Sequence, residues 1–103
     1  MKLLTKELRG KFPRVYTTEE VPSGEKVVIA KFFQPWGSWT WYAVEFDGED
    51  QFFGLVDGFE LEWGYFSLSE LESIRGPGGL GIERDLYFGN PQIKDVPALR
   101  GRV

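Results

Sequence analysis

The strongest constraint on the fold is a series of four segments rich in β-branched and aromatic residues, separated by short turn signals. The segments are 26–33, 39–46, 52–56 and 59–66. An Asp-Gly pair follows the second segment and another follows the third, and such pairs are typical of tight hairpins. Connections this short join neighbouring strands that run in opposite directions. The sequence therefore predicts an antiparallel β-meander.

The second segment has large side chains at both alternating sets of positions. One set is Trp39, Trp41 and Ala43, and the other is Thr40, Tyr42, Val44 and Phe46. Two apolar faces are typical of a central strand that is covered on both sides. We therefore favour the core for these tryptophans over a platform that stacks nucleic-acid bases. Trp36 lies in a predicted turn between Pro35 and Gly37, and we expect its ring to be exposed.

Two short helices are predicted outside the meander. Thr5 fits the N-cap of a helix over 5–11, along which apolar residues recur at four-residue spacing. Ser67 and Glu70 form a capping box in front of a second helix over 67–75. Both helices are expected to pack on the sheet.

The end of the chain completes the predicted fold. Residues 82–88 predict a fifth strand, at an edge of the sheet, and 90–103 is expected to be a flexible basic tail. The chain is short enough for one domain over residues 1–103. The predicted class is α+β, with a single antiparallel sheet of four to five strands and two short helices.

Two residue types that carry much of enzyme chemistry are missing, because the chain has no cysteine and no histidine. This excludes disulfides, thiolate metal sites, catalytic triads and imidazole acid–base chemistry. We expect a non-enzymatic protein without a cofactor, a metal site or catalytic residues. There is no apolar run long enough to span a membrane and no signal-peptide pattern, which favours a cytoplasmic protein.

Charge is unevenly distributed along the chain, whose net charge is −4. The two ends, 1–14 and 94–103, are basic, whereas 15–93 holds four basic and fourteen acidic residues, a net charge of −10. The stretch 45–62 has seven acidic residues and no basic one. An acidic body opposes broad binding to nucleic acids, whose phosphates require Lys and Arg.

We interpret the acidic tract, together with one turn and one loop, as a surface for a protein partner with a basic surface; an ordinary solvated face is the alternative. In this interpretation, Glu60 and Glu62 form one patch with the acids of the preceding hairpin. The predicted partner-binding residues are Glu45, Asp47, Glu49, Asp50, Glu60, Glu62, Trp36, Gly78 and Gly79.

Three further patterns give alternative hypotheses. Residues 76–81 match G-x-G-x-x-G, but they follow a predicted helix and contain Pro77, which favours a hinge or a partner-contacting loop over a dinucleotide site. The basic ends with Trp36 and Tyr42 would serve an accessory nucleic-acid-binding module. Three carboxylates, Asp57, Glu83 and Asp85, would serve a metal-assisted hydrolase, although charges on an edge strand also discourage aggregation.

Several long runs resemble a known family of small bacterial proteins, domain of unknown function 2958. The runs are 1–8, 31–33, 37–42, 53–59, 64–71 and 79–88. The resemblance covers nearly all of residues 1–89 and is weaker after Asn90. It implies no chemistry for any single residue. It does imply a setting in plasmids, phages and other mobile elements, beside DNA-modifying and anti-restriction proteins, and it therefore favours an anti-defence role.

Overall fold

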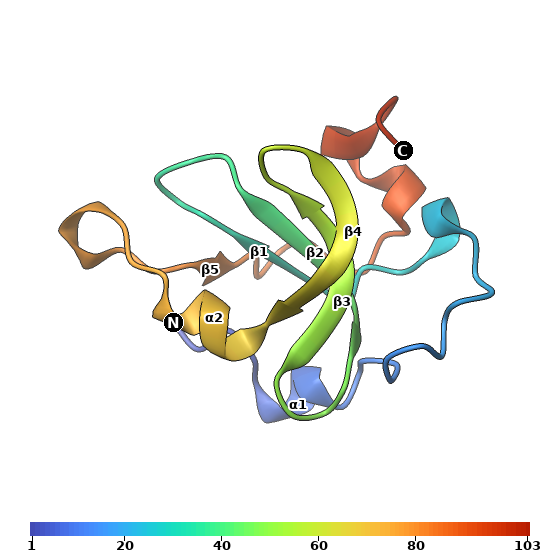
Figure 1. The fold of residues 1–103 in the computed structure, drawn as a ribbon, viewed down its shortest axis with the longest axis horizontal. Coiled ribbons are helices and arrows are strands. Elements are labelled where there is room, and N and C mark those ends of the chain that lie inside the picture. The colour runs from blue at the N-terminus through green and yellow to red at the C-terminus, as the bar shows by residue number, and fades with distance from the viewer.

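A five-stranded antiparallel sheet forms the centre of the molecule, in a computed structural model that describes residues 1–103 (Figure 1). The strands are β1 (Ala30–Phe33), β2 (Thr40–Phe46), β3 (Gln51–Asp57), β4 (Leu61–Ser67) and β5 (Glu83–Arg84), in the spatial order β4-β3-β2-β1-β5. The helices are α1 (Lys6–Arg9) and α2 (Leu68–Ser73). Four 3-10 turns complete the chain: η1 (Ser23–Glu25), η2 (Pro77–Gly79), η3 (Ile93–Asp95) and η4 (Pro97–Leu99).

The predicted α+β fold is confirmed. The meander is present, β2 lies in the middle of the sheet, and six of its seven residues are buried. Both predicted helix caps form: the Thr5 hydroxyl accepts the Leu8 N–H at 3.1 Å, and the Ser67 hydroxyl accepts the Glu70 N–H at 3.0 Å. No helix of the fold is both long and apolar enough to cross a membrane.

A β-bulge in β2 changes which face its last residues occupy. Ala43 pairs with Gly54, but the next pair is Glu45 with Phe53, so Val44 has no partner on β3. The extra residue shifts the alternation by one position. Phe46 therefore packs on the same face as Ala43, and the prediction that it shares a face with Tyr42 was wrong.

The first face of the sheet carries the larger core and both helices. Its buried residues are Leu3, Leu4, Phe12, Ala30, Phe32, Trp41, Ala43, Phe46, Phe52, Phe66, Leu68, Leu71 and Ile82. Phe52 is central, since its ring centroid lies 4.6–5.4 Å from those of four other phenylalanines. The N-terminal segment is tied to this face by Arg84, whose guanidinium donates to the Lys2 and Leu3 carbonyls.

The second face is covered by the end of the chain, at the upper right of Figure 1. The buried residues of this smaller core are Val28, Tyr42, Leu55, Ile93, Val96 and Leu99. The last three come from η3, η4 and the link between them. The structure thus differs from the flexible tail expected at 90–103: three apolar side chains at three-residue spacing lie on one side of successive 3-10 turns, where they cover the sheet.

Candidate functional site

The acidic tract is divided between the two ends of β3. The turn that joins β2 to β3 lies beside α1, and the turn that joins β3 to β4 lies at the opposite end, near the C-terminal segment (Figure 1). Because β3 has seven residues, the two turns stand about 20 Å apart. Glu60 and Glu62 therefore do not form one patch with Asp47, Glu49 and Asp50, as the sequence had suggested.

Glu45 is not a surface residue. The bulge directs its side chain to the second face, where Glu45 pairs with Phe53 of β3. The side chain is only 2% exposed there, because the segment with Tyr16 and Thr18 covers it. The carboxylate accepts the backbone N–H groups of Tyr16 and Thr18, each at 2.9 Å, and also the Thr18 hydroxyl. A carboxylate that is already bonded in this way is not available to a partner protein.

Two more acids of the tract stabilise local structure. Asp47 Oδ1 accepts the backbone N–H groups of Glu49, Asp50 and Gln51 at 2.8–3.0 Å. The N–H of Glu49 is the largest cause of a lowered pKa for Asp47. Asp50 accepts the Ser69 N–H at 2.9 Å and the Ser69 hydroxyl at 2.7 Å, and it thus joins the hairpin to α2. Glu49 is the exposed acid of this hairpin whose side chain forms no hydrogen bond and no ion pair.

The other end of β3 brings carboxylates and aromatic rings together on the first face, in what we call the β3–β4 turn surface. It is lined by Trp39, Val56, Gly58, Phe59, Glu60 and Glu62, around a hollow of about 440 Å³. The Phe59 side chain is 94% exposed, and its ring meets the half-buried Trp39 edge-on, at 5.1 Å between centroids. A side chain at Gly58 would collide with the Trp39 ring, so glycine permits this packing.

The two carboxylates of this surface act on each other. Protonated Glu62 can donate a hydrogen bond to the Glu60 carboxylate, and this bond, together with the negative charge of Glu60, raises the pKa of Glu62. Neither residue has a lysine or arginine within ion-pair distance. The β3–β4 turn surface therefore combines an exposed ring with a local excess of negative charge.

The turn with Trp36 and the loop with Gly78 and Gly79, which the sequence predicted to bind the partner, lie outside the β3–β4 turn surface. Trp36 is half-buried and packs on the first core, with its indole so close to Gly76 that any side chain there would overlap the ring. The prediction of an exposed Trp36 was therefore wrong. Gly78 and Gly79 are exposed in η2 and have positive φ of 68° and 79°, which explains the choice of glycine. Their loop protrudes at the left of Figure 1, away from the β3–β4 turn surface.

The residues that the nucleic-acid-binding and metal-assisted hydrolase hypotheses require do not form a site. Tyr42 is 1% exposed, so it is not free to stack on a base. Asp57 and Glu83 lie in one row across four strands, about 14 Å apart, since three strand spacings separate them. Asp57 binds Arg102 through two hydrogen bonds of 2.9 and 3.0 Å, and Asp85 forms an ion pair with Lys31 at 3.6 Å. No group of three carboxylates is placed to hold a metal ion.

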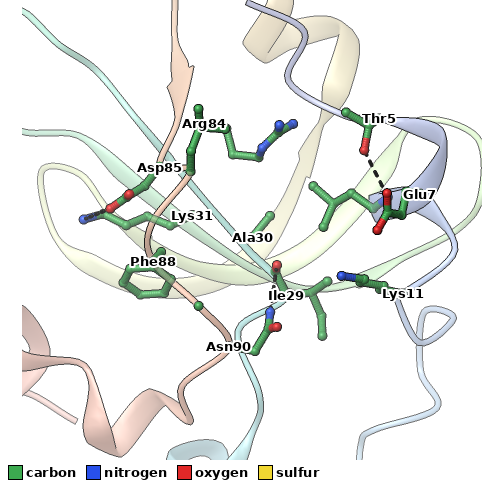
Figure 2. Close-up of a pocket in the computed structure, with 13 residues that line it drawn as sticks. Thr5, Glu7, Lys11, Ile29, Ala30, Lys31, Arg84, Asp85, Phe88 and Asn90 are labelled. Carbon is green, nitrogen blue, oxygen red and sulfur yellow. Dashed lines mark hydrogen bonds and ion pairs between the residues drawn. The ribbon is translucent and has the colours of Figure 1, made fainter.

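A second hollow, of about 250 Å³, lies between α1, β1 and the segment after β5 (Figure 2). Most of its polar side chains already have partners within the fold. Lys31 forms an ion pair with Asp85 and lies over the Phe88 ring. The Asn90 amide donates hydrogen bonds to two carbonyls of the chain before β1. Lys11 is the cation there without such a contact. This hollow is therefore a weaker candidate than the β3–β4 turn surface.

Sequence reasoning found Glu60 and Glu62 but missed their aromatic neighbours. Trp39 was assigned to the core, against which it does pack, but it also lines this surface; Phe59 was assigned to the start of a strand. The signal was present, since an aromatic residue between Gly58 and Glu60 stands where a turn usually carries polar residues.

Comparison with known proteins gives one match. A family model described as "Protein of unknown function (DUF2958)" matches residues 3–94. No curated protein and no solved structure matches the chain.

Proposed function

Because the chain belongs to the DUF2958 family, whose description assigns no activity, we propose a function from the site itself: the protein is a non-enzymatic interaction module. Its β3–β4 turn surface binds a basic segment of a partner protein. The observation that carries this proposal is Phe59, which is 94% exposed beside two carboxylates that have no lysine or arginine within ion-pair distance.

The chemistry of this surface favours a cationic partner. Aromatic residues are enriched at the centres of protein interfaces, where they supply much of the binding energy. An arginine or lysine placed between Glu60 and Glu62 would relieve the repulsion that raises the pKa of Glu62. Its alkyl stem or guanidinium would at the same time cover the Phe59 ring. The net negative charge of the body would steer the encounter.

The class of partner follows from charge and setting. Proteins that hold DNA need basic surfaces, and an acidic module that occupies such a surface excludes the nucleic acid. In the mobile-element setting that the family resemblance implies, the fitting partner is a host defence complex of the restriction or CRISPR type. We accordingly place the protein in the bacterial cytoplasm, where such complexes act, as an inhibitor of one of them.

The test compares three versions of the tagged protein in a pull-down from bacterial lysate, read by mass spectrometry. One variant combines Phe59→Ala with Glu60→Lys and Glu62→Lys; the control is Glu49→Lys, which makes one such charge reversal at the far hairpin. A partner retained by the wild type and the control but lost with the triple variant supports the proposal. A partner that also binds the triple variant refutes the surface. Loss of every captured protein after nuclease treatment would refute direct protein binding.

A further inference from the structure

Four aromatic rings form a continuous row on the second face of the sheet, opposite the β3–β4 turn surface. Trp63 stacks on Phe53 at 5.6 Å, Phe53 contacts Tyr65 at 5.1 Å, and Tyr65 meets Tyr16 edge-on at 6.3 Å. Tyr65 is 47% and Tyr16 is 65% exposed. One end of the row therefore faces solvent, beyond the part of the face that the C-terminal segment covers.

The exposed end of this row encloses a small hollow. Its volume is about 200 Å³, and its lining is Tyr16, Glu19, Lys26, Glu45, Phe53 and Tyr65. Pockets for whole drug-sized ligands usually measure about 300–1,000 Å³. The hollow is thus the right size for one headgroup or one side chain.

The charged groups of the lining leave a net negative charge at the hollow. The Lys26 ammonium is already bound, since it donates to the Thr18 carbonyl and to the Thr18 hydroxyl, the latter at 3.2 Å. Two carboxylates, Glu19 and Glu45, outnumber this single cation. Both carboxylates help to raise the pKa of Tyr65, after the larger effects of its hydrogen bond with the Tyr16 side chain and of desolvation. The field at the mouth of the hollow is therefore negative.

We propose that this hollow binds an organic cation, a methylated alkylammonium group, against the rings of Tyr16, Phe53 and Tyr65 that line it. Aromatic faces attract such cations through the ring quadrupole, and several rings around one ammonium are the usual cage for a methylated nitrogen. The carboxylates add charge attraction. The methyl groups carry no hydrogen-bond donor, so they leave none unsatisfied against the rings.

Backbone geometry prepares the cage before any ligand arrives. Tyr16 has φ of 72°, a left-handed conformation that is uncommon for a bulky residue. Glu45 maintains it by accepting the N–H groups of Tyr16 and Thr18. The buried carboxylate thereby fixes the backbone that carries the Tyr16 ring, and a backbone that is already ordered loses little freedom when the site binds a ligand.

The first experiment uses choline as the probe, with its uncharged isostere 3,3-dimethylbutan-1-ol as the control ligand. Ligand-observed NMR follows the N-methyl protons, which ring currents shift upfield inside an aromatic cage. We expect saturable binding of choline and much weaker binding of the neutral alcohol. Equal affinities for the two ligands, or no saturable shift with choline or a trimethyllysine peptide, would overturn the proposal.

Variants locate the site. Tyr65→Ala removes one ring at a half-exposed position, and we expect the choline dissociation constant to rise about tenfold. Tyr65→Phe keeps the ring and should keep the affinity; Tyr87→Ala removes a ring that is 94% exposed elsewhere and should change nothing. An unchanged affinity in Tyr65→Ala, with the fold confirmed by circular dichroism, would refute the assignment.

A final titration distinguishes two sources of such a cation, a modified protein side chain and a small metabolite. A short peptide that carries one trimethyllysine is titrated beside choline. Tighter binding of the peptide identifies a modified protein side chain as the ligand, and tighter binding of choline identifies a small metabolite. Competition between the two for one site is expected in either case, and simultaneous binding would refute a single cage.

Discussion

Replacing Glu45 by glutamine tests whether one buried carboxylate organises the loop before η1. The carboxylate accepts three hydrogen bonds, two of them from backbone N–H groups of Tyr16 and Thr18. An amide has one oxygen to accept and one NH₂ group that donates, so at least one of these N–H groups meets another donor. A buried donor without an acceptor costs about 1–3 kcal/mol.

A second effect adds to the first. Lys26 is only 8% exposed and shares the Thr18 hydroxyl with Glu45, so the substitution leaves a buried ammonium without its nearby negative charge. We therefore expect Glu45→Gln to lower the free energy of unfolding by about 2–4 kcal/mol. A domain of this size usually has about 5–15 kcal/mol in total.

Urea unfolding, followed by tryptophan fluorescence, measures this free energy. Glu49→Gln is the matched control, since the same chemical change at an exposed side chain should alter stability by about 0.5 kcal/mol or less. Amide hydrogen exchange adds local detail: protection at Tyr16 and Thr18 should fall most. A Glu45→Gln protein as stable as the control, with both amides still protected, would refute the reasoning.

Three further predictions concern the bulge, the end of the chain and acid stability. Gly54→Ala should lower the free energy of unfolding by about 2–4 kcal/mol in a urea titration, because the new Cβ would lie 2.0 Å from the Tyr42 carbonyl oxygen; an unchanged midpoint would contradict the close approach of the strands. Deleting all residues after Asn90 should expose the second core, so that the chain binds the dye ANS and loses its sharp thermal transition; a cooperative melt without dye binding would contradict this. The lowered pKa of Asp47 means that its stabilising effect is complete above the unfolded pKa, usually 3.8, and is lost as the pH falls through the folded value; Asp47→Asn should remove this part of the acid dependence, and identical acid-unfolding curves would contradict it.

The meander was predictable because its signals are local. Asp-Gly turns and alternating apolar residues specify antiparallel neighbours without any knowledge of the remaining chain. The caps at Thr5 and Ser67 are local as well, and both form as expected. Such features depend on residues within a few positions of one another.

The errors concern features that depend on partners distant in the sequence. The bulge at Val44 is set by the pairing of β2 with β3, and it moves Glu45 to the second face, where the distant segment with Tyr16 and Thr18 covers it. Trp36 is half-buried because Gly76, forty residues further on, leaves room for its ring. The predicted acidic patch was wrong for a different reason, since the length of β3 holds the two turns that it joins at opposite ends of the sheet.

The two cores also impose an order in time. Residues 3–82 supply every buried side chain of the first core, whereas the second core is incomplete until residues 93–99 have been made. A ribosome adds residues one at a time from the N-terminus. Until residues 93–99 reach the sheet, one of its sides is covered and Tyr42 and Leu55 on the other side remain exposed to water. During that interval the chain is open to chaperones, and to wrong pairings, on one side only.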